Sequence, residues 1–161
     1  MVEQVDTGRL KLALVCSHGG HLNEMIQLAE AFEGSDTFYF SYDADTTRRL
    51  PRAYLVPNMA KNPVELVKNI VRLWRIFRCE KPDVMVSTGA EIALPALVVA
   101  KCLRVGVVYI ECGAQVTHPS FTGRIMCRAA DAFFVQWPEL LEYYGTRARY
   151  AGSLIDTTLP R

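Results

Sequence analysis

With 161 residues, of which 50% are hydrophobic and 22% charged, the chain has the composition of one globular domain, and a disordered chain is excluded. Its net charge of +1 provides no overall attraction to nucleic acid, so no nucleic-acid partner is expected. The single domain is expected to span residues 1–161, with its core over about 10–155.

Short β-rich runs alternate with helical runs along the chain. Strands are predicted at 10–16, 37–41, 53–56, 83–87, 106–110 and 132–135, with one more strand edge at 150–154. Helices are predicted at 21–33, 63–79, 91–103, 120–130 and 137–144. This alternation predicts an α/β fold, a Rossmann-like parallel sheet with helices on both faces. Ligands of such sheets bind at the carboxyl ends of the strands, so a functional site is expected in the loops there.

The first strand is followed by a glycine turn at 16–21, directly before a helix. The two glycines can turn sharply and approach a ligand closely, and the N–H groups that begin the helix suit a phosphate or diphosphate. Ser17 either binds that ligand or caps the helix, and Glu24 is expected to complete a capping arrangement. His18 and His21 would add a hydrogen bond or proton transfer. A plain turn with incidental histidines stays open.

The turn after the strand at 83–87 is the second polar turn. Thr88 and Gly89 offer hydroxyl and backbone donors to a ligand. Glu91 is expected in the first turn of the next helix, where an acidic side chain stabilises the helix dipole. The functional alternative is that Glu91 binds a sugar hydroxyl or acts as a catalytic carboxylate.

The turn after the strand at 106–110 carries the stronger candidate carboxylate. Glu111 adjoins an apolar strand end, where an acidic side chain is costly unless it is paired or faces a ligand. Ser120 is expected to cap the following helix, and Arg124 is placed to reach a phosphate or Glu111.

The helix predicted at 63–79 is basic and amphipathic. Lys68, Arg72 and Arg75 share one narrow stripe, whereas Trp74 belongs to a broad apolar arc. Such a helix can lie on an anionic membrane or contact a partner. It can equally cover the sheet with a solvated basic face. The apolar arc is wide enough for one part to pack against the sheet and another part to contact lipid or a partner.

The five cysteines are odd in number and form no C-x-x-C pair, which predicts free thiols in a reducing, cytoplasmic setting. Cys16, His18 and His21 have no evident fourth ligand nearby, so no metal is expected, and no cofactor. The longest apolar run, at 92–110, is interrupted by Lys101 and Arg104, so a membrane span is not expected.

Five motifs occur together in a specific order, at 18–21, 87–91, 109–111, 122–124 and 130–137. Taken together they resemble the PssD/CpsF-type polysaccharide-biosynthesis proteins of bacteria. These in turn are similar to the membrane-recruiting subunit of the eukaryotic two-subunit N-acetylglucosaminyltransferase of dolichol-linked oligosaccharide synthesis. The resemblance covers about residues 10–155.

The resemblance implies half of a GT-B glycosyltransferase, similar to the amino-terminal domain of MurG-type enzymes. This half would bind a lipid-diphosphate-linked sugar acceptor on the inner face of the cell membrane, as a peripheral protein. A small partner subunit, similar to the carboxyl-terminal half, would hold most of the site for a nucleotide sugar, expected to be a UDP-sugar. The pair would transfer the sugar to an acceptor hydroxyl.

The resemblance also implies roles for individual residues. By this resemblance His21 matches the histidine of the family's Gly-Gly-His turn, Glu111 matches the glutamate after its fifth strand, and residues 89–91 match the turn after its fourth. Either His21 or Glu111 is expected to be the general base. The acceptor and its diphosphate are assigned to Ser17, His18, Gly19, Gly20, Thr88, Gly89, Glu91 and Arg124. The amphipathic pattern of the helix at 63–79, and not the resemblance, assigns membrane or partner contact to Lys68, Arg72, Trp74 and Arg75.

Two departures from the family and two other functions qualify this interpretation. The eukaryotic subunits begin with a membrane-spanning helix that this sequence does not show, and the turn at 112–114 replaces a serine and a bulkier residue, which affects acceptor specificity. One alternative is a non-catalytic module that recruits a partner to the membrane. The other, a nucleotide-cofactor oxidoreductase, is disfavoured because the first turn lacks G-x-G-x-x-G and no acid clearly follows the second strand.

Overall fold

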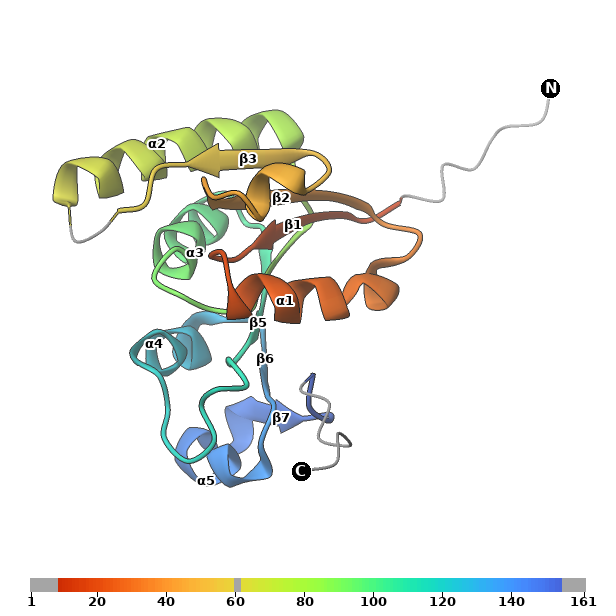
Figure 1. Ribbon diagram of the computed structural model, residues 1–161. Coiled ribbons are helices and arrows are strands. Elements are labelled where there is room, and N and C mark those ends of the chain that lie inside the picture. Colours follow the sequence, from red (N-terminus) through yellow and green to blue (C-terminus); the bar gives the residue numbers. More distant parts are fainter. Residues whose placement is uncertain (1–8, 60–61, 155–161) are drawn as a thin grey trace.

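The computed structural model describes residues 9–59 and 62–154 and forms one parallel sheet flanked by helices (Figure 1). Seven strands pair in the order β3-β2-β1-β4-β5-β6-β7. Their bounds are β1 Lys11–Val15, β2 Asp36–Tyr42, β3 Ala53–Val56, β4 Val84–Ser87, β5 Gly106–Ile110, β6 Ala132–Val135 and β7 Ala148–Tyr150. Three of them, β3, β5 and β6, have the predicted bounds. The predicted Rossmann-like fold is confirmed.

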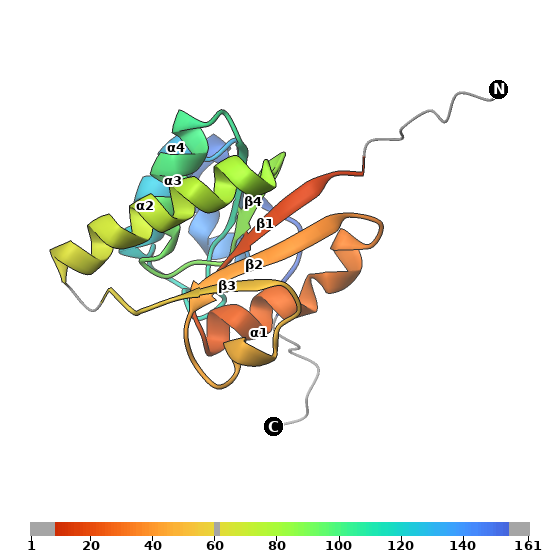
Figure 2. The ribbon, with the colours of Figure 1, turned by 90° about the horizontal axis from the view of Figure 1, so that it is seen from above.

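The helices cover the two faces of the sheet unequally. Their bounds are α1 Gly20–Gln27, α2 Pro63–Glu80, α3 Ala93–Cys102, α4 Phe121–Ala129 and α5 Leu141–Tyr144. Short 3₁₀ turns occupy Ala29–Phe32, Thr47–Arg49, Pro138–Leu140 and Gly145–Arg147. Helices α2, α3 and α4 lie on one face and α1 on the other (Figures 1 and 2).

Two hydrophobic clusters follow from this arrangement. The larger cluster joins the sheet to α2, α3 and α4, and includes Phe38, Phe77 and Met126. The smaller joins the sheet to α1 and includes Leu14 and Met25. Burial on both faces explains why the central strands are continuously apolar.

Local backbone geometry corrects several predicted boundaries. The helix predicted at 21–33 ends at Gln27, because the Leu28 N–H bonds to the Met25 carbonyl and tightens the chain into a 3₁₀ turn. The helix predicted at 137–144 is a 3₁₀ turn followed by the single turn α5. The last strand precedes the predicted edge, because Ala148–Tyr150 pairs with β6.

Glu91 and Ser17 also differ from their predicted local roles. Gly89 and Ala90 both have positive φ, at 121° and 68°, which delays the helix until Ala93. Glu91 therefore precedes α3 instead of lying in its first turn. Gly19 is the N-cap of α1 and no side chain caps it, so the capping role of Ser17 is wrong.

None of the helices in the described ranges is both long and apolar enough to cross a membrane. All five cysteines are free thiols, as predicted. Residues 60–61, inside the loop between β3 and α2, lie outside the described residues, as do 1–8 and 155–161 at the two ends of the expected domain.

Candidate functional site

The loops at the carboxyl ends of β1, β4 and β5 meet around a pocket of about 270 Å³, here called the rim pocket. It is lined by His21, Ala90, Tyr109, Glu111, Cys112, Ala114, Gln115, Ser120, Phe121 and Thr122. His21 comes from α1, Glu111 from the end of β5, and Phe121 from the start of α4. The sequence-based expectation that His21 and Glu111 lie at one edge of the sheet is consistent with this geometry.

Two hydrogen bonds fix the position of His21. Its Nδ1 lies 2.9 Å from the carbonyl oxygen of Thr88, and the Thr88 hydroxyl donates to the His21 carbonyl at 2.7 Å. A carbonyl oxygen can only accept, so Nδ1 carries the proton. When the imidazole is neutral, Nε2 is therefore the nitrogen with a free lone pair and can take a proton.

Thr88 and Gly89 support His21 in ways that the sequence did not reveal. Thr88 is fully buried, and its hydroxyl donates a hydrogen bond to the main-chain carbonyl of His21. Gly89 has a φ of 121°, and a Cβ at this position would lie 2.8 Å from Cε1 of His21. A side chain at 89 would thus be strained and would displace the imidazole.

Glu111 is fully buried and has neutral hydrogen-bond donors. Its Oε2 accepts from the hydroxyl of Tyr144, and its Oε1 accepts from the N–H of Cys112 at 3.2 Å. Burial and the hydrogen bond to Glu111 both raise the pKa of Tyr144, so its hydroxyl stays protonated at neutral pH. Gly123 of α4 packs on the same carboxylate, and a Cβ there would overlap with Oε2.

Glu24, which was expected to cap α1, supports the loop behind the rim pocket. Only 8% of it is exposed, and its Oε1 accepts from the N–H of Gly113 at 2.9 Å and from the thiol of Cys112 at 3.4 Å. Its Oε2 has no hydrogen-bond partner within the described parts of the chain. The capping role is therefore wrong, and Glu24 holds the loop after β5 instead.

One set of side chains in the described ranges has donor atoms close enough to hold a metal ion. Atoms of His21, Glu24 and Cys112 lie within 4.8 Å of one another. Burial raises the pKa of Cys112 to about 11, so its thiol is protonated and donates to Glu24. This set shares only His21 with the sequence-based set of Cys16, His18 and His21. Cys16 is fully buried, and burial raises the pKa of its thiol to about 12.

Gln136 and Trp137 hold the same loop from the end of β6. The Gln136 amide donates to the Glu111 carbonyl at 3.1 Å and accepts from the N–H of Leu154 at 2.9 Å. The indole of Trp137 donates to the Gly113 carbonyl at 2.6 Å. The loop that carries Glu111 is thus fixed from α1 and from β6, which orients the carboxylate before any ligand binds.

The remaining predicted residues lie around the rim pocket. His18, Gly19 and Gly20 are exposed at the start of α1, and the Ser17 hydroxyl donates to the His18 carbonyl at 3.2 Å. Ser120 caps α4 as predicted, accepting from the N–H of Gly123 at 2.7 Å.

Arg124 lines a neighbouring pocket of about 390 Å³ with Arg128 and Arg147. Glu111 has Tyr144 as its partner, so the expected contact between Arg124 and Glu111 is not formed. Tyr144 was missed because it lies 33 residues from Glu111, beyond any local motif.

Comparison with known proteins identifies the family. A model of the family described as "Oligosaccharide biosynthesis protein Alg14 like" matches residues 49–154, more than half of the chain. The chain belongs to the Alg14-like family. It is 26% identical to the UDP-N-acetylglucosamine transferase subunit ALG14 of Saccharomyces cerevisiae, over 91% of this chain and 77% of that protein. It is 25% identical to the human subunit of the same name, over 91% of this chain and 83% of that protein.

Solved structures agree on the fold of this Alg14-like chain. MurG of Acinetobacter baumannii matches with a TM-score of 0.74 at 16% identity, over 94% of this chain and 46% of MurG. A UDP-N-acetylglucosamine 2-epimerase of Rickettsia bellii matches with a TM-score of 0.71 at 14% identity, over 91% of this chain and 45% of that protein. The chain thus spans about half the length of these structures. Because a transferase and an epimerase share this fold, the fold alone does not decide the activity.

Proposed function

We propose that this Alg14-like chain is the acceptor-binding, membrane-associating subunit of a two-subunit glycosyltransferase. With its partner it transfers a sugar from a nucleotide-sugar donor to a lipid-diphosphate-linked acceptor in polysaccharide or oligosaccharide synthesis. The supporting observation is the rim pocket, which brings a histidine with a fixed tautomer beside a buried carboxylate. The names of the yeast and human relatives favour UDP-N-acetylglucosamine as the donor. The bacterial PssD/CpsF branch of the family stays a prediction.

His21 is the stronger candidate for the general base. Its Nε2 has a free lone pair, whereas both oxygens of Glu111 already accept hydrogen bonds. In the proposed reaction the acceptor hydroxyl oxygen bonds to the anomeric carbon of the donor, and the bond from that carbon to the diphosphate breaks. The nucleoside diphosphate leaves, and the hydroxyl proton passes to Nε2 of His21. Glu111 orients the acceptor through its carboxylate.

The exposed start of α1 is the proposed site for the acceptor diphosphate. Gly19 and Gly20 present backbone N–H groups there, and a helix N-terminus favours negative charge. Ser17 and His18 adjoin this point, and Gly89 lies against His21. The diphosphate would then lie beside the rim pocket, with the acceptor sugar inside it.

The proposed activity is tested with the chain coexpressed with a small subunit that carries the carboxyl-terminal half of a GT-B enzyme. We expect the purified pair to transfer radiolabelled N-acetylglucosamine from its UDP ester to a lipid-diphosphate sugar. Each subunit assayed alone should be inactive, because each supplies half of the cleft. Transfer by this chain alone, or none by a stable pair over a panel of donors and acceptors, would contradict the proposal.

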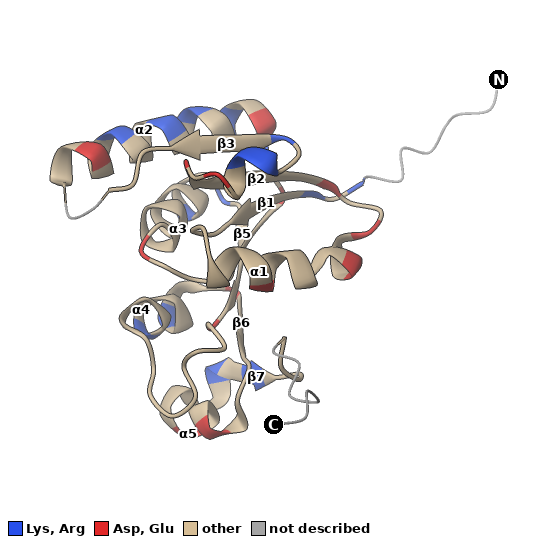
Figure 3. Ribbon diagram, in the orientation of Figure 1, with Lys and Arg blue, Asp and Glu red and all other residues tan. Residues whose placement is uncertain are grey.

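Helix α2 is the proposed contact with the membrane. Val64, Val67 and Val71 are exposed on it, and Trp74 is 36% exposed. Lys and Arg positions recur along the same helix (Figure 3). Lys68 and Arg72 pair with Glu65, at 2.8 and 3.5 Å, whereas Arg75 is exposed. Apolar side chains interleaved with cations favour an anionic lipid surface, here the cytoplasmic face of the cell membrane.

Liposome flotation tests this contact. We expect the chain to float with vesicles that contain anionic lipid and less with neutral vesicles. Arg75→Glu should lower the bound fraction about fivefold or more, because one cation near an anionic surface contributes about 1 kcal/mol. Arg149→Glu is the matched control, since Arg149 is exposed on β7 at the opposite edge of the sheet. Equal losses in both variants would show that α2 is not the contact.

A further inference from the structure

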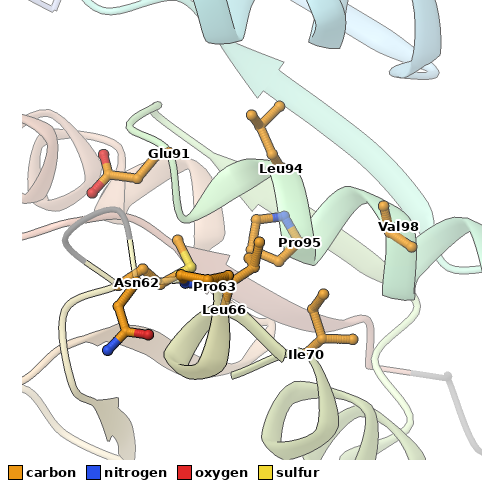
Figure 4. A pocket seen from close by; sticks show the side chains of 9 residues that line it. Asn62, Pro63, Leu66, Ile70, Glu91, Leu94, Pro95 and Val98 are labelled. Carbon is orange, nitrogen blue, oxygen red and sulfur yellow. The ribbon is translucent and has the colours of Figure 1, made fainter. Parts of the chain in front are cut away.

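A third pocket, of about 500 Å³, lies between α2 and α3 and is here called the helix pocket (Figure 4). Leu66 and Ile70 of α2 form one wall, and Leu94, Pro95 and Val98 of α3 form the other. Almost the whole lining is apolar, so the pocket offers a sugar or nucleotide few hydrogen-bond partners. Its ligand should therefore be a hydrocarbon.

The two polar residues of the helix pocket lie toward one end of it. Asn62 and Glu91 appear together on one side in Figure 4, whereas Val98 and Ile70 lie toward the other. Asn62 caps the start of α2, accepting from the N–H of Val64 at 3.0 Å, and Glu91 directly precedes α3. The pocket therefore has a polar end near the starts of both helices and an apolar far end.

The helix pocket and the rim pocket adjoin across a single turn. Ala90 lines the rim pocket, and Glu91, the next residue, lines the helix pocket. Gly89, one residue earlier, lies against His21. A molecule held beside His21 thus needs to cross only the turn at 89–91 to enter the helix pocket.

We propose that the helix pocket binds the hydrocarbon chain of the lipid-linked acceptor, in the segment next to its diphosphate. This inference rests on the proposed function, which places the acceptor sugar and diphosphate around the rim pocket. The acceptor is an amphiphile, so its apolar chain needs an apolar path that begins beside the diphosphate. The volume lies within the about 300–1,000 Å³ of small-molecule sites.

The charge of Glu91 and the exposure of two lining residues assign the direction in which the acceptor's hydrocarbon chain runs through the pocket. Glu91 was expected to bind the acceptor or its diphosphate, but it lies at the polar end of the helix pocket, where its carboxylate would repel an anionic diphosphate and so keep it on the His21 side of the turn. Leu66 is 37% exposed and Val98 is 54% exposed, so the pocket is open toward solvent. Val67, the neighbour of Leu66, is among the exposed apolar residues of α2. The hydrocarbon chain of the acceptor can therefore leave the pocket directly into the lipid surface that α2 is proposed to contact.

The test compares two acceptors with the same sugar diphosphate, one on a two-isoprene chain and one on a long polyisoprenoid. Both are assayed with the assembled pair in detergent, which removes the contribution of a membrane. We expect Val98→Asp and Leu66→Asp to raise KM for the long-chain acceptor by about tenfold or more, because a charge enters an apolar site. The short-chain acceptor should be affected less. Ile26→Asp is the control, since Ile26 is exposed near the end of α1, on the other face of the sheet, and lines neither the helix pocket nor the rim pocket.

A binding measurement on the chain alone separates this inference from the proposed function. We expect a fluorescent polyisoprenyl diphosphate to bind the unaltered protein and the Ile26→Asp variant equally well, and to bind Val98→Asp about tenfold more weakly. Failure of the pair to transfer sugar to either acceptor would refute the proposed function, not the pocket assignment. Equal effects on both chain lengths together with equal probe binding would overturn the inference. Loss of pairing by Val98→Asp, with probe binding retained, would show that the pocket binds the partner subunit instead.

Discussion

Replacing His21 by alanine is expected to lower turnover of the assembled pair by about 10²- to 10⁴-fold, the usual contribution of a general base. Assembly with the partner should change little, because Thr88 of the same subunit holds the His21 imidazole in place. The measurement is kcat with saturating acceptor, beside the association constant of the two subunits.

His118→Ala is the matched control for this experiment. His118 is exposed, and its ring contacts Tyr143 outside the rim pocket. We expect its replacement to leave kcat within about twofold of the unaltered pair, as for a surface substitution away from special features. Equal loss of turnover and of pairing by His21→Ala would refute the catalytic assignment. Full retention of activity would favour the alternative of a non-catalytic recruiting module.

Replacing Glu111 by glutamine is expected to lower kcat by about 10²-fold or more, since a carboxylate aimed into a buried site acts more strongly than a neutral amide. Glutamine keeps the volume but cannot provide a carboxylate to the acceptor. The thermal midpoint should stay unchanged or rise, because the only partners found for this buried charge among the described residues are neutral donors. Kinetics and thermal denaturation of the same preparations supply both measurements.

Tyr144→Phe tests whether the carboxylate must be held in place. Removal of the Tyr144 hydroxyl leaves Glu111 in the pocket without its Oε2 donor. We expect a smaller loss of kcat, about tenfold, with KM for the donor unchanged.

A Glu111→Gln variant that keeps full activity would refute the role of Glu111. One that unfolds at a clearly lower temperature would indicate a structural role instead.

The strands were the easiest part to predict from the sequence. The runs at 106–110 and 132–135 are apolar, because both faces of the sheet are covered, and the structure reproduces these bounds. The start of α3 was harder to predict. It depends on the positive φ of Ala90, a backbone conformation that residues other than glycine rarely adopt. No pattern in the sequence predicts it.

Within the candidate site, the residues in polar turns were predictable and their partners were not. His21 and Glu111 follow strands of one parallel sheet, so topology alone places them at the same edge. The partners of Glu24 lie 88 and 89 residues away, at Cys112 and Gly113, and one is a backbone N–H. Likewise the acceptor for His21 is the main-chain oxygen of Thr88. Such atoms occur in every residue, so a sequence carries no signature of them.

The hydrogen bond from Leu154 to Gln136 has a consequence for biosynthesis of the subunit. Gln136 donates to the main chain at Glu111 while it accepts from Leu154, so the last described residue of the chain helps to orient that amide. A nascent polypeptide on the ribosome can pair β5 with β6 before Leu154 is made. Only after translation has passed Leu154 can the full set of contacts around the carboxylate form. Prematurely terminated products that end before Leu154 would therefore keep most of the sheet but lack one of the contacts that orient the Gln136 amide.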